Sequence, residues 1–155
     1  MNAPAVGGAF LVSQVGAYAA NGFARRLSRL RLKPHDAGIL RMLGSNPGLT
    51  QQALSKLMGV FPSQLVGLID GLEERRLIER RSSPKDRRRY QLHLTNAGRK
   101  TLTEIGKVTL QLEDDLFTAL NQRELDFFCQ LLRRIVAQKQ ITPGVHPAYK
   151  QLGRR

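Results

Sequence analysis

Arginine and lysine side chains, whose chemistry is the binding of anions, gather in one stretch of this sequence. Residues 75–89 contain eight basic residues and two acidic ones. The whole chain shares this excess, because 25 Lys and Arg against 12 Asp and Glu give its 155 residues a formal net charge of +13. Such an imbalance favours a polyanionic partner: nucleic acid is the commonest, and a membrane surface is the main alternative.

The other reactive groups form no coherent catalytic or metal-binding pattern. Cys129 is the single cysteine, which excludes an internal disulfide and fits a reducing cytoplasm. Because it lies in an apolar helix, we expect it to be a structural core residue. His35, His93 and His146 lack the spacing of metal ligands. No nucleophile with a base, paired carboxylates or phosphate loop stands in a suitable context. We therefore expect a cytoplasmic protein that is not an enzyme and needs no cofactor or metal.

Two short helices around a glycine corner precede the basic stretch. The first, at 51–58, begins after Thr50, a good N-cap, and ends at Gly59, while Val60 fills the corner. The second begins at Pro62 and carries apolar residues at i, i+3, i+4 and i+7. This order predicts a helix-turn-helix, whose second helix enters the major groove of duplex DNA with its N-terminal residues at the base edges.

The basic stretch itself joins two candidate strands. Residues 77–78 precede it, turn-forming residues occupy 82–84, and residues 90–94 alternate apolar and polar side chains. We expect a two-stranded hairpin with a basic tip, placed to reach a minor groove, where the negative potential favours arginine. A helix-turn-helix followed by strand, basic loop and strand is the order of a winged helix.

Long helices flank this region on both sides. Apolar periodicity predicts a helix from 10 to about 30 and another after Pro34, while Thr95 and Asn121 begin two more, at 96 to about 119 and up to about 138. No run approaches the 18 apolar residues that span a membrane. The apolar N-terminal segment has no preceding positive charge, which disfavours a signal peptide.

Residues 49–100, "LTQQALSKLMGVFPSQLVGLIDGLEERRLIERRSSPKDRRRYQLHLTNAGRK", resemble the MarR family of bacterial transcription regulators. The matching motifs are "LT" before the first short helix, "LIDGLE" late in the recognition helix, "LIERR" entering the wing, "DRR" at its tip and "LTNAG" opening the long helix. With the flanking helices, the resemblance covers residues 10–140. It implies a homodimer that binds near-palindromic double-stranded DNA through two winged helices.

The expected fold is mainly α with a small β-hairpin wing, in a single domain of residues 1–155. The resemblance divides this domain into a winged helix-turn-helix region at 34–95, dimerisation helices at 10–31 and 96–140, and a flexible basic tail at 141–155.

The resemblance also implies which residues contact DNA. In the recognition helix they are Pro62, Ser63, Gln64, Val66 and Gly67, and Thr50 and Gln51 lie where the preceding helix approaches phosphate. At the wing tip, Asp86 would orient Arg88 into the minor groove, with Lys85, Arg87 and Arg89 beside it.

Two departures from the family pattern affect this expectation. Gly67 and Gly71 stand where many members carry polar or basic side chains, so that base readout by the helix is expected to be thin. Arg76 stands where the family usually has glycine, at the end of the recognition helix, where a left-handed conformation is costly for any other residue.

Many MarR proteins bind small aromatic or phenolic effectors between the dimerisation helices and the winged domain. Tyr18, His35 and Met42 are candidates for such a cleft but serve equally well as core residues, so no ligand site is assigned. The sequence predicts a sequence-specific transcriptional regulator, a repressor in the first instance. The alternative is an architectural DNA or RNA binder that uses the same basic surface without sequence preference.

Overall fold

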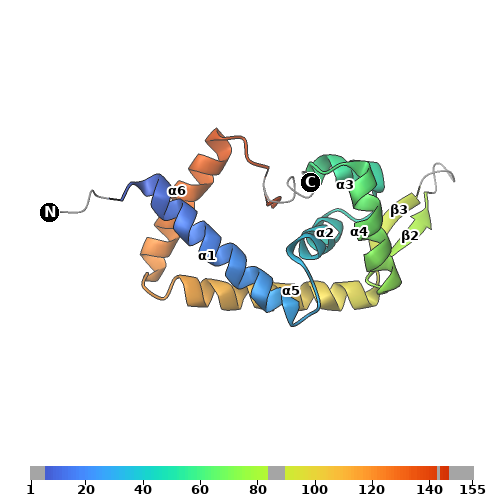
Figure 1. Cartoon of the computed structure of the whole chain (residues 1–155), viewed down its shortest axis with the longest axis horizontal. Coiled ribbons are helices and arrows are strands. Elements are labelled where there is room, and N and C mark those ends of the chain that lie inside the picture. Colours follow the sequence, from blue (N-terminus) through green and yellow to red (C-terminus); the bar gives the residue numbers. More distant parts are fainter. Residues whose placement is uncertain (1–5, 84–89, 143, 147–155) are drawn as a thin grey trace.

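The computed structural model describes residues 6–83, 90–142 and 144–146. In chain order its elements are α1 (Gly8–Ser28), α2 (Pro34–Ser45), β1 (Leu49–Thr50), α3 (Gln51–Met58), α4 (Pro62–Glu74), β2 (Ile78–Ser82), β3 (Tyr90–Leu94), α5 (Asn96–Leu116) and α6 (Gln122–Gln138) (Figure 1). The mainly helical winged fold predicted from the sequence is confirmed.

The sheet contains one strand more than the predicted hairpin. β3 lies in the middle and pairs antiparallel with β2 over five residues, from Ile78 opposite Leu94 to Ser82 opposite Tyr90. On its other side it pairs with β1, where Leu49 lies opposite Leu92. The predicted hairpin of β2 and β3 is confirmed. The third strand, β1, was not predicted, because a strand of two residues has too few positions to show alternation.

The apolar core lies at one end of the molecule, which we call the winged end (residues 32–95). It is formed by side chains from α2, α3, α4 and the sheet, completed by the end of α1 and by the first half of α5. In α4 the predicted inward residues Leu65, Ile69 and Leu72 are almost fully buried, while Leu68 is half-buried. The amphipathic prediction for α4 is therefore confirmed.

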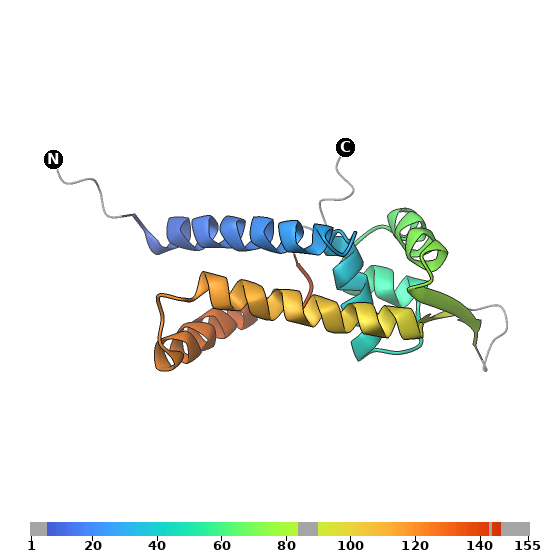
Figure 2. The same ribbon diagram turned by 90° about the horizontal axis from the view of Figure 1, so that it is seen from below.

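The other end, which we call the helical arm, consists of residues 8–18 of α1, residues 109–116 of α5, and α6. α1 and α5 lie side by side (Figure 2), and Arg26 of α1 forms an ion pair with Asp115 of α5 at 2.8 Å. α6 crosses beneath them and contains no buried residue in the single chain. Cys129, predicted to be a core residue, is accordingly only half-buried.

The chain returns from α6 to the winged end. Val145 is 7% exposed and belongs to the core, and a Cβ on Gly144 would lie 3.4 Å from the terminal methyl of Met42 in α2. A flexible tail was expected from residue 141, but Gly144 and Val145 pack against the winged end. The buried side chain of Val145 attaches this short segment to the core. None of the described helices is long and apolar enough to cross a membrane.

Candidate nucleic-acid interface

The corner between α3 and α4 sets the direction of the predicted recognition helix. Gly59 ends α3 in a left-handed conformation (φ 63°), which glycine adopts without steric strain. The Ser55 hydroxyl donates a hydrogen bond of 2.7 Å to the carbonyl of Val60, whose side chain is buried in the corner. Pro62 then opens α4, where its fixed φ suits the first turn. The predicted helix-turn-helix geometry is confirmed.

The predicted contact residues of α4 differ in their exposure to solvent. Pro62, Ser63, Val66 and Gly67 are exposed, whereas Gln64 is half-buried. The side-chain oxygen of Gln64 accepts a hydrogen bond of 3.3 Å from the backbone N–H of Phe61, the residue before the helix. This amide therefore caps the start of its own helix, and its oxygen is engaged within the chain.

Thr50 and Gln51 lie at the start of α3, beside the sheet. The Thr50 hydroxyl oxygen accepts a hydrogen bond of 3.2 Å from the N–H of Ala53, which confirms it as the N-cap. Both residues line a cavity of about 220 Å³, together with Gln52, Arg80, Tyr90 and Leu92. The cavity joins the start of α3 to the base of the wing.

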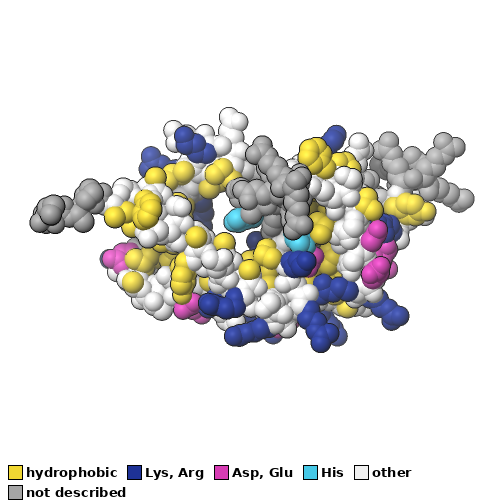
Figure 3. Space-filling view, in the orientation of Figure 1, with side chains coloured by type: hydrophobic (Ala, Val, Ile, Leu, Met, Phe, Trp, Pro, Cys, Tyr) yellow, Lys and Arg dark blue, Asp and Glu magenta, His cyan; other side chains and the backbone are white. Residues whose placement is uncertain are grey.

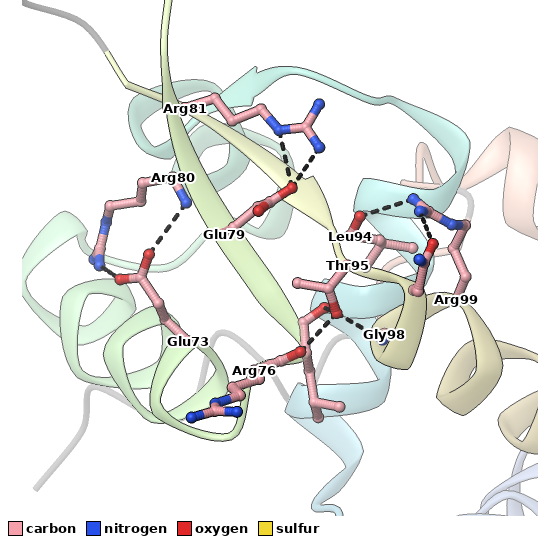
Figure 4. Close-up of polar contacts among 11 residues, drawn as sticks. Glu73, Arg76, Glu79, Arg80, Arg81, Leu94, Thr95, Gly98 and Arg99 are labelled. Carbon is pink, nitrogen blue, oxygen red and sulfur yellow. Dashed lines mark hydrogen bonds and ion pairs between the residues drawn. The ribbon is translucent and has the colours of Figure 1, made fainter.

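The base of the wing is held to α4 by one arginine. Arg80 of β2 donates one hydrogen bond from its guanidinium and one of 3.1 Å from its backbone N–H to the Glu73 carboxylate (Figure 4). The guanidinium also donates a hydrogen bond of 2.5 Å to Asp70. Burial disfavours the charged form of Arg80. The hydrogen bond to Asp70 and the negative charges of Glu73 and Asp70 outweigh it, so the pKa of Arg80 lies above its ordinary value.

The neighbouring Arg81 takes no part in this attachment. Successive side chains of a strand point to opposite faces, and Arg81 pairs with Glu79 of its own strand. The side chain of Arg81 is 57% exposed, against 25% for Arg80. Sequence reasoning counted both residues simply as members of the basic run, and the signal it lacked was which face of β2 each one occupies.

Arg80 also offsets part of the negative charge of the recognition helix. α4 carries Asp70, Glu73 and Glu74 and no basic residue, and acidic side chains are visible at its place in the space-filling view (Figure 3). Unpaired carboxylates would repel DNA phosphates. By pairing with Asp70 and Glu73, Arg80 offsets part of that repulsion and keeps the wing beside the helix.

The joint between α4 and the wing contains Arg76, where the sequence raised doubt about the cap. Arg76 adopts a left-handed conformation (φ 56°). Its N–H bonds to the carbonyl of Glu73 at 2.8 Å, and the N–H of Leu77 bonds to that of Leu72 at 3.0 Å, which is a Schellman motif. The cap is thus formed as with glycine, but by a residue for which the conformation is strained.

The same joint fixes the start of α5. The Thr95 hydroxyl donates a hydrogen bond of 2.6 Å to the carbonyl of Arg76 and accepts one of 3.0 Å from the N–H of Gly98 (Figure 4). A Cβ on Gly98 would lie 1.9 Å from the carbonyl oxygen of Leu77, so no larger residue fits without a backbone shift. One small region therefore positions the recognition helix, the wing and α5.

The remaining predicted residues are distributed as follows. Lys85, Asp86, Arg87, Arg88 and Arg89 lie outside the described residues.

Tyr18 is 52% exposed on α1, whereas His35 at the start of α2 and Met42 further along it are half-buried. His35 lies 3.4 Å from the buried Asp36, and burial lowers the pKa of His35 although Asp36 opposes this shift. No group of three or more metal-ligating side chains occurs among the described residues.

Comparison with known proteins agrees with this geometry. The model of the MarR family matches residues 32–89. A protein of Thauera aromatica, provisionally assigned as the transcriptional regulator of the hcr operon, is 37% identical over 123 residues, which is 79% of this chain and 74% of that protein.

Solved structures show the same architecture. A crystal structure of MarR superposes with a TM-score of 0.75 at 27% identity, covering 90% of this chain and 95% of that one. The transcriptional repressor CouR, bound to a 23-mer DNA duplex, superposes with a TM-score of 0.72 at 29% identity, covering 83% and 91%. From its winged fold, its sequence and these relatives, the chain is a DNA-binding transcriptional regulator that belongs to the MarR family.

Proposed function

We propose that the chain is a homodimeric, sequence-specific repressor that acts in the cytoplasm on a near-palindromic operator. The observation that carries this proposal is the attachment of the wing to the exposed recognition helix through Arg80. A fixed angle between helix and wing lets one protomer address a major groove and the neighbouring minor groove together. A protein that bound DNA without preference would have little use for a fixed angle.

The homodimer is supported by the apolar surface of the helical arm. Phe10, Leu11, Val15 and Tyr18 of α1 are at least 42% exposed, as are Phe127 and Ile135 of α6. An apolar surface of this kind on elements without a core of their own marks a protein–protein contact. In the dimer the two recognition helices would address half-sites roughly 34–36 Å apart.

We assign three kinds of contact within each half-site. The exposed first turns of α4, at Pro62, Ser63, Val66 and Gly67, meet base edges, and Thr50 and Gln51 approach phosphate. Lys85, Arg87 and Arg89 add phosphate contacts at the wing, where Asp86 orients Arg88 into the minor groove. The repressor CouR, a relative at 29% identity, binds duplex DNA, which supports repression as the mode of action.

A selection of genomic fragments by the purified protein, at about 0.15 M salt, followed by footprinting, tests the proposal. We expect one class of fragment with a protected near-palindrome, and an affinity roughly a thousandfold or more above that for unrelated duplex. Recovery of all fragments alike, with binding that only salt weakens, would instead identify an architectural protein.

A further inference from the structure

The exposed surface at the start of the recognition helix is apolar. Phe61, the residue before α4, is 67% exposed, and Val66, one turn further on, is 42% exposed. Pro62 and Gly67 are exposed beside them. These residues lie at the end of the helix that meets base edges in a helix-turn-helix protein.

Hydrogen-bonding groups are scarce on the same surface. Ser63 is the one exposed position from 61 to 67 with a polar side chain, and the oxygen of Gln64 caps the N–H of Phe61. α4 contains no Lys or Arg, and two of the three acids in its second half, Asp70 and Glu73, pair with the wing. The surface therefore lacks the arginine that would read guanine, and the amide best placed to read adenine is engaged.

The major groove offers one base-edge feature that an apolar surface recognises. It is the C5-methyl group of thymine, which cytosine, adenine and guanine lack. Gly67 helps a close approach, because a Cβ at this position would have no atom within 4 Å and its absence leaves the helix surface flat beside Val66.

We propose that Phe61 and Val66 are specificity-determining residues that read thymine methyl groups in each half-site. The inference rests on the proposed function and specifies the operator bases that α4 selects. Each methyl buried against one of these side chains contributes to affinity through apolar burial, and each is worth about a fourfold change in Kd.

The test replaces thymine by uracil in the operator duplex recovered by the fragment selection. Uracil keeps every hydrogen-bonding group of thymine and lacks only the methyl, so the substitution isolates the contact. We expect uracil at single positions facing α4 to raise Kd about fourfold. Uracil under the wing should have no effect, because the thymine methyl lies in the major groove.

Side-chain truncation completes the cycle. In Phe61→Ala, uracil at one of the sensitive positions should no longer change Kd, while the position read by Val66 keeps its effect; Val66→Ala should show the reverse. Leu57→Ala truncates another exposed apolar residue, at the end of α3, and should leave both effects intact. The side chains of Phe61 and Val66 are both exposed, so these variants are expected to fold.

The outcomes separate the inference from the proposed function. A specific operator whose affinity is unchanged by uracil at every position, or whose uracil effects persist in both variants, would overturn the thymine assignment and leave the regulator standing. Unselective recovery of fragments would overturn both.

Discussion

The winged end encloses an apolar core within one copy of the chain, whereas α6 of the helical arm buries no residue at all. The sequence of α6 is nevertheless amphipathic; two of its large apolar side chains, Phe127 and Ile135, are exposed, and the others are half-buried. The difference shows that one chain contains enough apolar surface to fold its DNA-reading part, while the exposed apolar residues of the arm support the proposed contact with a second copy. The joint at Arg76, Thr95 and Gly98 connects the winged end to α5, which continues into the arm.

The largest effect is expected from a charge placed on the apolar face of α6. Phe127→Asp or Ile135→Asp should convert the dimer to monomers, because a carboxylate buried in an apolar contact costs several kcal/mol. Operator binding should fall by at least a hundredfold, and circular dichroism should show that the winged end remains folded. Analytical ultracentrifugation measures the first effect and a binding titration the second.

The matched control for these variants is Gln130→Asp, which places the same charge on the polar side of α6. It should leave both the dimer and its affinity for DNA unchanged. Dimers that persist in Phe127→Asp and Ile135→Asp would show that the second copy docks elsewhere, and would remove the contrast between the two ends.

The next effect concerns the joint between the ends. Gly98→Ala should destabilise the protein by about 1–3 kcal/mol, since the new methyl would displace the carbonyl of Leu77. Gly106→Ala, in the same helix with open space around it, should stabilise it by about 0.5–1 kcal/mol. Urea unfolding of both variants measures the difference, and effects of the same sign would mean that the joint is not closely packed.

Arg80→Ala tests whether the winged end needs its internal attachment. We expect the free energy of unfolding to fall by about 1–2 kcal/mol. The loss is smaller than for a fully buried ion pair, because the carboxylates of Asp70 and Glu73 are partly exposed. Operator affinity should fall further, since Asp70 and Glu73 are then unpaired near phosphate. Arg81→Ala removes an equal charge without releasing α4, so equal losses of affinity would refute the attachment.

The sequence was sufficient to predict the order of elements, because helical and alternating periodicities and the caps at Thr50, Thr95 and Asn121 are local signals. The resemblance to the MarR family, which usually has glycine at this position, marked Arg76 as an unusual cap. The sequence could not reveal that Arg80 and Arg81 have different partners, since this depends on how β2 packs against α4. The strand β1 and the buried Val145 were likewise missed, because each is specified by a tertiary contact and has almost no pattern of its own.

Arg76→Gly and Gln140→Gly compare the backbone strain of a left-handed residue in the winged end with that of one in the arm. Removal of a left-handed arginine should stabilise the protein by up to about 1 kcal/mol, after allowing for the greater freedom of glycine in the unfolded chain. Gln140 ends α6 in a similar conformation (φ 52°), but Gln140→Gly should raise the thermal midpoint less if the arm is held mainly by the second copy. Equal shifts would indicate that both ends unfold as one unit.

The smallest effect is expected from pH at the start of α2. Burial lowers the pKa of His35 in the folded chain, so the folded state binds its proton less readily than the unfolded state. The stability that neutral His35 permits is therefore fully present above the ordinary pKa of about 6.5 and is lost as pH falls below it. Because His35 lies in the winged end, its protonation should weaken folding there and leave the apolar contact of the arm unchanged. His35→Gln should flatten the dependence of the unfolding free energy on pH between 7 and 5. A slope that survives in this variant would assign the titration to another group.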